Sequence, residues 1–416
     1  MKPTGLCRTH RRPPLVAVAA LAVLFAAVGC GGRAPRPVLP TASAVPPAPS
    51  TPEAEPATPA PTPTAPAMQP PGAPRHPPVP AGGPVPTGFT ARSVTFVSDR
   101  QAYVLGDAPC RRAPCTSVVR TLDGGRSWRG VPAPRAALPA LAPTAWPESR
   151  DTVRQIRFAT GRDGYAYGGG LWTTHDGART WRRVSGLDTV LDLEVDGRTA
   201  YAVVGHCTGL GECHSGLLAS SVSADMFRPV IGLAPRPVGG LDGAVSTGGG
   251  TSVFSLDHAR YVHRAASGWT RIAEPCRPLD GSVVAPASGS TLSAYCAEGA
   301  AGSVYLSIRH STDLGRHWTT GSVPALRLPN GLTALTAGSA TTLAAAAAHP
   351  DLGGGLSVSR DGGRTWSAVP TPGKAIGWRY VGARSATALV ALVDPPASTL
   401  WTSDTAGRTW TVHPIR

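Results

Sequence analysis

One short motif recurs through residues 88–416 and limits the folds that this sequence can adopt. Each complete copy begins with Ser or Thr, carries an Asp one or two positions later, has a small residue near its centre and ends in Trp. Five stretches have this form: Thr121–Trp128, Thr174–Trp181, Ser311–Trp318, Ser359–Trp366 and Ser403–Trp410. Asp and Ser/Thr side chains bond nearby backbone N–H groups and Gly adopts positive φ, so each copy is expected to form a tight turn.

Two degenerate copies fill the gap between the second and third complete ones. Ser220–Phe227 has Phe in place of Trp, and Ala265–Trp269 keeps the Trp but lacks the Asp. The aromatic positions then lie 42 to 53 residues apart, and seven periods over residues 88–416 average 47 residues. Short runs of Val, Leu, Tyr and Thr between the turns are typical of strands. We therefore predict an all-β, seven-bladed β-propeller of four-stranded antiparallel blades.

The repeated Asp and Trp residues are predicted to be structural. One copy per blade places the acids on a ring, far from one another, so they do not form a catalytic or metal-binding cluster. A Trp after the turn can bury its ring between neighbouring blades, and the turn then joins the third and fourth strands. This structural set is Asp123, Trp128, Asp176, Trp181, Asp313, Trp318, Asp361, Trp366 and Trp410.

The repeat resembles the Asp-box, or BNR repeat, of sialidase-like propellers, and its seven blades are similar to those of photosystem assembly factors. The resemblance to sialidases implies an arginine triad, a Tyr–Glu pair and an acidic Asp. However, the Arg-Ile-Pro motif of that family is missing from the first strand, Thr90–Val97, while Arg157 and Arg379 lie on other first strands. We therefore assign no catalytic residue and expect a non-enzymatic binding or scaffold propeller.

A diverged glycan-acting hydrolase, sialidase-like in origin, is the alternative. Its mark would be a pair of carboxylates about 5–10 Å apart in the central channel, with Arg or Tyr beside them.

The N-terminus predicts export. Four basic residues in positions 1–12 precede an apolar run, Leu15–Val28, which makes a secretory signal too short to span a bilayer comfortably. Ala27–Cys30 resembles the lipobox of bacterial lipoproteins, which implies a lipid on Cys30. The alternative is an ordinary secretory signal with cleavage nearby. We expect the protein to be extracytoplasmic, anchored by lipid to the membrane of a bacterial cell envelope.

A proline-rich segment separates the signal from the repeats. Residues 34–86 hold 20 of the 44 prolines, which excludes regular helix or sheet there. The predicted organisation is a lipoprotein signal peptide over residues 1–29, a Pro-rich disordered stalk over 30–87 and the propeller over 88–416.

The cysteines of the repeat region are expected to form disulfides, because exported proteins meet oxidising conditions. Blade geometry predicts three local pairs: Cys110 with Cys115, Cys207 with Cys213, and Cys276, which enters blade 5, with Cys296, at the end of its second strand. His206, Glu212 and His214 beside the second pair leave zinc or copper binding open. The disulfide interpretation is favoured, and no metal or other cofactor is assigned.

The remaining candidate binding residues lie in loops that the repeat does not specify. The insert Arg135–Asp151 contains Trp146, Glu148 and Arg150, and an exposed Trp among charges can anchor a sugar or peptide; packing against the fold is the alternative for Trp146. Arg111, Arg112, His206, Glu212 and His214 are expected on the same face, opposite the motif turns.

The charge does not identify a ligand. The formal net charge of +14 is almost entirely Arg, a bias that genome composition also produces, so nucleic acid is not expected. The expected partner is an unknown envelope protein or glycan, bound by a monomer.

Overall fold

The computed structural model consists of strands and turns, without helices among the residues it describes. These are residues 82–111, 115–138, 149–187, 189–209, 212–230, 243–256, 259–264, 268–276, 281–287, 289–300, 303–321, 334–347, 354–372, 377–393 and 398–416. The predicted signal peptide, Cys30 and nearly all of the predicted stalk lie outside this set. No helix within the set is long and apolar enough to cross a membrane.

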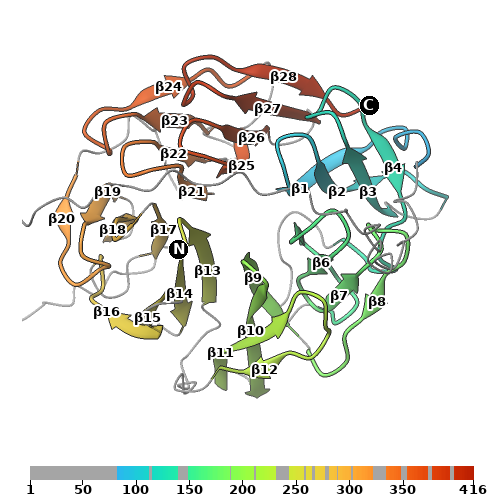
Figure 1. The fold of residues 1–416 in the computed structure, drawn as a ribbon, viewed down its shortest axis with the longest axis horizontal. Coiled ribbons are helices and arrows are strands. Elements are labelled where there is room, and N and C mark those ends of the chain that lie inside the picture. Colours follow the sequence, from blue (N-terminus) through green and yellow to red (C-terminus); the bar gives the residue numbers. More distant parts are fainter. Residues whose placement is uncertain are drawn as a thin grey trace, which may run out of the picture. The chain divides into compact units, whose positions relative to one another are not determined.

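Seven antiparallel sheets of four strands each stand in a ring, as Figure 1 shows, so the predicted seven-bladed propeller is confirmed. Blades 1 to 4 comprise β1 (Thr90–Phe96), β2 (Ala102–Ala108), β3 (Cys115–Thr121), β4 (Arg129–Val131), β5 (Gln155–Phe158), β6 (Gly164–Tyr167), β7 (Leu171–Thr174), β8 (Arg182–Arg183), β9 (Val190–Asp196), β10 (Thr199–Gly209), β11 (Glu212–Ser221), β12 (Arg228–Pro229), β13 (Gly243–Gly248), β14 (Thr251–Leu256), β15 (Ala259–Arg264) and β16 (Gly268–Ile272).

Blades 5 to 7 continue in the same order. They comprise β17 (Gly281–Pro286), β18 (Leu292–Ala300), β19 (Ser303–Ser311), β20 (Thr319–Thr320), β21 (Ala334–Ala337), β22 (Leu343–Ala346), β23 (Leu356–Ser359), β24 (Ser367–Val369), β25 (Trp378–Ala383), β26 (Leu389–Val393), β27 (Thr399–Ser403) and β28 (Thr411–Pro414).

The ring closes without exchange of strands, because each sheet consists of four consecutive strands. Blade 7 must therefore hold blade 1 through side chains. The Ser398 hydroxyl donates to the Phe89 carbonyl at 2.7 Å, and Arg384 pairs with Asp99 at 3.1 Å. Trp128 of blade 1 packs in one cluster with Leu400 of blade 7 and its neighbours.

The repeated motif forms the turn between the third and fourth strands of its blade, hereafter the motif turn. In blade 1 the Thr121 hydroxyl accepts a hydrogen bond from the Gly125 N–H at 2.9 Å, and Asp123 accepts one from the Ser127 N–H at 2.9 Å. Contacts of the same kind surround the other three repeated acids. Desolvation favours a higher pKa for Asp123, but hydrogen bonds from Ser127, Thr121 and the Arg126 N–H outweigh it and lower the pKa to about 2.

The small residue of the motif turn is required by the preceding blade. A Cβ atom on Gly407 would lie 2.9 Å from Val358, and one on Gly315 would lie 2.9 Å from Ile272, with positive φ at both glycines. Ala178 occupies the equivalent position in blade 2 at a φ of 67°, which is uncommon for a residue with a side chain. Neighbouring blades thus approach each other closely at these glycine-containing turns.

The aromatic rings of the motif pack on the preceding blade as well. Trp181 donates from its indole nitrogen to the Pro132 carbonyl at 2.9 Å, and Trp318 donates to Ala273 at the same distance. Trp128 is 4% exposed among residues of blade 7. Each ring therefore belongs to the interface between two blades.

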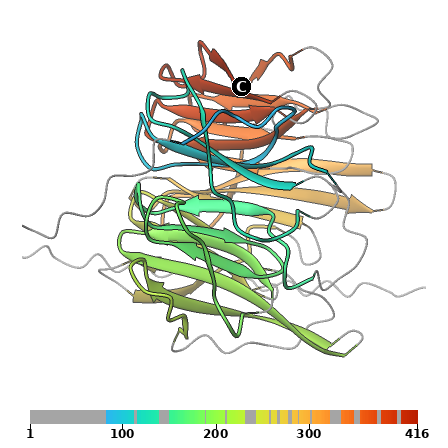
Figure 2. The same cartoon turned by 90° about the vertical axis from the view of Figure 1, so that its right-hand side faces the viewer.

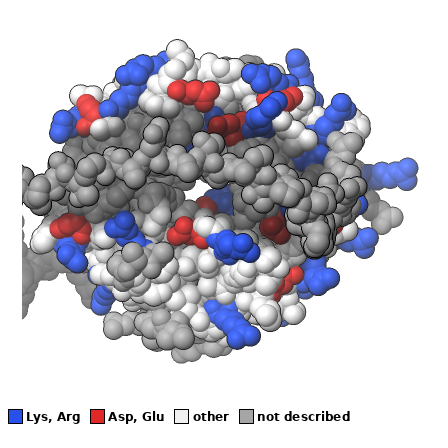
Figure 3. Space-filling view, in the orientation of Figure 1, with Lys and Arg blue, Asp and Glu red and all other residues white. Residues whose placement is uncertain are grey.

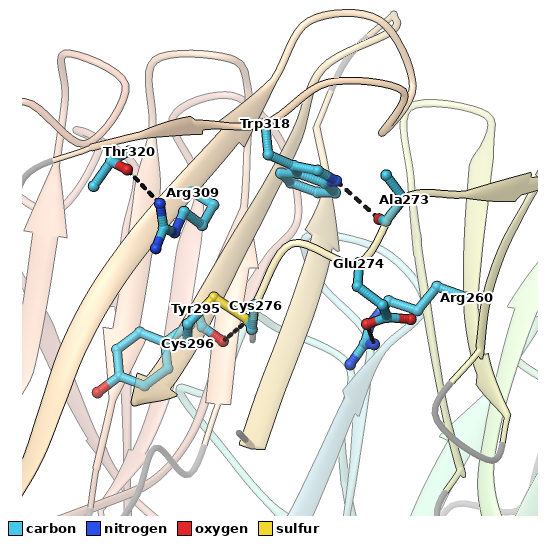
Figure 4. The surroundings of a disulfide bond; sticks show 9 residues. All are labelled: Arg260, Ala273, Glu274, Cys276, Tyr295, Cys296, Arg309, Trp318 and Thr320. Carbon is cyan, nitrogen blue, oxygen red and sulfur yellow. Dashed lines mark hydrogen bonds and ion pairs between the residues drawn. A yellow bond between two sulfur atoms is a disulfide. The ribbon is translucent and has the colours of Figure 1, made fainter. Parts of the chain in front are cut away.

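Two of the three expected disulfides are confirmed. Cys110 bonds Cys115, the first residue of β3, and Cys276 bonds Cys296, tying the segment that enters blade 5 to β18 (Figure 4). Cys296 lies inside β18 and not at its end as expected, because pairing with β19 continues as far as Ala300. The backbone register places Cys207 opposite Cys213, but these side chains lie outside the described set.

Two hairpins are longer than the others. The strands β10 and β11 have 11 and 10 residues, and β18 and β19 have nine each, against seven or fewer elsewhere in the described strands. In Figure 2 both hairpins extend past the remaining blades on the same side of the ring. Loops between second and third strands lie at this end, so it is the face opposite the motif turns.

Candidate binding site in the central channel

The innermost strands of the blades line a cavity of about 840 Å³ in the middle of the ring. Its walls come from β1, β5, β9, β13, β17, β21 and β25 and from the loops that follow several of them. These loops lie beside the motif turns, as the Gly124 N–H donating to the Arg100 carbonyl at 2.8 Å illustrates. The pocket therefore occupies the part of the channel on the motif-turn side.

Strand alternation decides which side chains reach the channel. On β5, Gln155 and Arg157 line the pocket while Ile156 is buried in the blade. On β9, Asp192 and Glu194 line the pocket while Leu193 is buried. The period of two thus places an amide, a guanidinium and two carboxylates on neighbouring blades.

Arg157 and Glu194 form an ion pair inside the channel. The guanidinium Nε lies 2.6 Å from a carboxylate oxygen, with the two side chains 14% and 22% exposed. Burial opposes the charge of Arg157, but Glu194 outweighs it and raises the arginine pKa. Burial also raises the pKa of Glu194, and Arg157 offsets this only in part.

Asp192 connects three blades. One carboxylate oxygen accepts hydrogen bonds from the Tyr167 hydroxyl at 3.0 Å and from the Leu193 N–H at 2.9 Å. The other accepts from the Val245 N–H of blade 4 at 3.0 Å. Both oxygens are engaged, so this acid connects blades 2, 3 and 4 at the wall of the pocket.

Tyr380 of blade 7 completes the polar wall. Burial and the nearby Glu194 carboxylate raise the pKa of its hydroxyl, and the Arg157 guanidinium offsets only part of this rise. A Cβ atom on Gly382 would lie 2.3 Å from the Tyr380 hydroxyl oxygen. The phenol therefore occupies space that a glycine at position 382 leaves open. Tyr380 therefore lies in the same electrostatic environment as the ion pair.

The opposite wall has small or apolar side chains. Blades 4, 5 and 6 contribute mostly uncharged residues, among them Ser246, Val283, Ala285, Ala334 and Thr336. The pocket consequently has one polar wall, from blades 7, 1, 2 and 3, and one weakly polar wall.

Arg384 borders the pocket at the motif-turn end. Its guanidinium contacts Asp99 and Asp404, each at 3.1 Å, and lies 5.0 Å from the centre of the Phe96 ring. Arg384 is 11% exposed while both acids are more than 80% exposed. It therefore joins blade 7 to blade 1 at the rim of the pocket.

The residues predicted from sequence lie elsewhere. Arg111, Arg150 and His206 are exposed in or near segments on the face opposite the motif turns. Arg112, Trp146 and Glu148 lie outside the described residues, as do the side chains of Glu212 and His214 on β11. A binding site on that face stays a prediction.

Arg157 was noted from the sequence, but Gln155, Asp192, Glu194 and Tyr380 were not identified there as channel residues. The usable signal was a pair of polar residues two positions apart on a first strand, as in Gln155/Arg157 and Asp192/Glu194. Tyr380 carries no such signal, since it lies near Arg157 only through closure of the ring. Among the described residues, no group of three or more His, Cys, Asp or Glu side chains could hold a metal ion.

Charged side chains are distributed around the propeller. Figure 3 shows basic side chains spread along the ring, with acidic ones between them, on the face that it presents. The positive charge is therefore not concentrated in one patch on the described part of this face.

Comparison with known proteins identifies the fold alone. No protein-family model and no curated protein sequence matches the chain. YCF48 from Cyanidioschyzon merolae is similar with a TM-score of 0.51 and 12% identity over 78% of this chain and 98% of that one. A structure of YCF48 bound to D1 peptide has a TM-score of 0.45 and 14% identity over 80% and 95% of the two chains. A GH74 xyloglucanase from Xanthomonas campestris has a TM-score of 0.41 and 15% identity over 77% of this chain and 72% of that one.

Proposed function

We propose that this chain is a non-enzymatic binding protein of the bacterial cell envelope that takes part of a protein or glycan ligand into its central channel. The observation that carries the proposal is the pocket wall, where each of the three lining acids already has a partner from the protein itself. A preformed concave site with a few placed polar groups is how proteins commonly hold small ligands and chain ends, and about 840 Å³ lies in the usual size range.

Carboxylates that are already engaged by the protein itself favour binding over chemistry. Glu194 is paired with Arg157 at 2.6 Å, and both oxygens of Asp192 accept hydrogen bonds from the surrounding blades. A general base or nucleophile needs a lone pair directed at the ligand. The two acids instead stabilise the shape of the polar wall.

The proposal includes attachment to the membrane by a lipid on Cys30, with the Pro-rich segment as spacer. Such a spacer reaches up to about 3.1 Å per residue, which holds the propeller away from the bilayer. Replacing Cys30 with Ala should release the protein into the medium or leave it unprocessed, as measured by membrane fractionation. Unchanged membrane association would contradict the lipid anchor without bearing on the channel.

A glycan-acting hydrolase is the second candidate, and one observation favours it. Asp192 and Glu194 lie two positions apart on β9, which separates them by about 7 Å along the strand, and both line the channel near Tyr380. The raised pKa of Glu194 is typical of a general acid. Turnover of fluorogenic glycosides by the full chain, abolished in Glu194→Gln, would replace the binding proposal with this one.

Binding in the channel is tested with a plugged variant. Ser246 is half-buried on β13 and lines the pocket, so Ser246→Trp should fill it. Val412 is 45% exposed on the outermost strand of blade 7, so Val412→Trp adds the same ring away from the channel. Arrays of oligosaccharides and peptides should contain ligands that the full chain and Val412→Trp bind and that Ser246→Trp does not. Equal binding by all three would refute a channel site.

A further inference from the structure

The charges that line the pocket compensate one another. The charged side chains among the described lining residues are two arginines, Arg157 and Arg384, and three acids, Asp99, Asp192 and Glu194, so the formal charge is minus one. Each arginine is paired with an acid, at 2.6 Å inside the channel and at 3.1 Å at the rim. The described lining of the pocket thus offers polar groups, and both of its cations are already paired with acids.

An anionic ligand would meet a formally negative pocket, and to take Arg157 as its own counter-ion it would have to draw that guanidinium away from Glu194. If Arg157 turned to a ligand carboxylate, Glu194 would remain in the channel, 22% exposed, without its cation and beside Asp192. An unpaired charge in such a place is strongly unfavourable. The pair therefore selects against acidic ligands.

The two walls differ in a way that suits a sugar ring. Arg157, Glu194 and Tyr380 present donors and acceptors on one side, while Val283, Ala285 and their neighbours present aliphatic surface on the other. An uncharged hexose carries hydroxyls around its edge and C–H groups on its faces. It can bond the ion pair at its outer atoms without separating the two charges.

We infer that the channel pocket binds a neutral, hydroxyl-rich ligand, namely the end of an uncharged glycan chain. The inference rests on the proposed function and narrows it to one ligand class. A peptide C-terminus is disfavoured, since its carboxylate would meet the same compensated arginines.

The test uses the full chain with defined probes. Maltopentaose, cellopentaose and mannopentaose are the neutral set, while sialyllactose and oligogalacturonate are the acidic set, each titrated by calorimetry. At least one neutral probe should bind the native chain and Val412→Trp, and should lose at least about tenfold in affinity for Ser246→Trp, because lost hydrogen bonds and steric overlap act together. Neither acidic probe should bind in a way that Ser246→Trp abolishes.

A change of specificity gives a readout that misfolding cannot imitate. Glu194→Gln keeps the size of the side chain and releases Arg157, so acidic probes should gain about tenfold or more in affinity through a charge-assisted hydrogen bond. Asp99→Asn changes the formal charge by the same amount at the rim, where the acid is 84% exposed, and should not produce this gain. Similar behaviour of the two variants would contradict the role assigned to the inner pair.

The outcomes separate the inference from the function on which it rests. Acidic probes or peptides that bind the native chain in the channel, in preference to neutral sugars, would overturn the inference and leave a binding propeller. Probe binding that Ser246→Trp never alters would overturn both.

Discussion

Two junctions between neighbouring blades each have a histidine at a motif turn, but the pKa values of the two histidines are shifted in opposite directions. At the junction of blades 2 and 3, His175 lies between Asp163 at 2.8 Å and Asp225 at 3.1 Å. Burial lowers the pKa of His175, but the two acids outweigh burial and raise it. The junction therefore favours the protonated form of this imidazole.

At the junction of blades 7 and 1, a histidine is held uncharged. The ring of His413 lies against Gly125, 3.1 Å from where a Cβ atom would be, and bonds the Thr402 hydroxyl at 2.8 Å. Burial, assisted by Arg126, lowers its pKa. The histidine at the seam of blades 7 and 1 thus contributes through packing, whereas the histidine at the junction of blades 2 and 3 contributes through charge.

The largest expected difference between the junctions comes from their aromatic residues. Trp128→Ala should cost about 3–5 kcal/mol, because it empties a buried site shared by blades 7 and 1. Phe227→Ala should cost less, because Phe227 is only partly buried against Tyr165, with ring centroids 6.3 Å apart. Thermal unfolding of both variants measures the contrast, and an equal loss would show that the seam is no more dependent on packing than other junctions.

A smaller loss is expected on removing the guanidinium that bridges the seam. Arg384→Ala gives up a cation–π contact with Phe96 and ion pairs with Asp99 and Asp404, together about 1–2 kcal/mol because both acids are exposed. Arg384→Lys should recover only part of this, since an ammonium cannot contact both acids in the same planar geometry. If Arg384→Lys recovered the full free energy of unfolding, charge alone would account for the contribution of Arg384 to the seam.

The histidine of the seam should make the ring sensitive to acid. Because the folded pKa of His413 is depressed, the unfolded chain binds more protons as the pH falls below about 6.5, and stability is lost. His413→Gln should reduce this loss between pH 7 and pH 5 relative to the native chain. His317→Gln, in the exposed motif turn of blade 5, is a control for a histidine outside the seam.

The smallest effect is expected at His175, whose contribution to stability should fall as the pH rises, the opposite of the change expected at His413. Its folded pKa is raised, so its contribution is complete below about 6.5 and is lost as the pH rises through the folded pKa. His175→Gln should lower the melting temperature more at pH 5.5 than at pH 8. Partial exposure of the imidazole keeps the change small. A larger effect at pH 8 would contradict the ion pairs with Asp163 and Asp225.

The fold was predictable because its signals are local. A Ser or Thr, an Asp and a small residue specify the motif turn within eight residues, and the period between turns sets the number of blades. The pairs Cys110–Cys115 and Cys276–Cys296 followed from the same geometry. Strand ends were less accurate, as at Cys296, since β-pairing depends on the neighbouring strand.

The channel site was not predictable to the same degree, because its parts are brought together only by closure of the ring. Alternation on β5 and β9 marks Arg157 and Glu194 as inward-facing, but nothing local pairs them or places Tyr380 beside them. The sequence by itself determined the repeated unit, since hydrogen bonds within each motif turn act over a few residues. Only the tertiary structure decided which first strands meet at the centre, and with them which charges compensate, because burial and pairing depend on every blade at once.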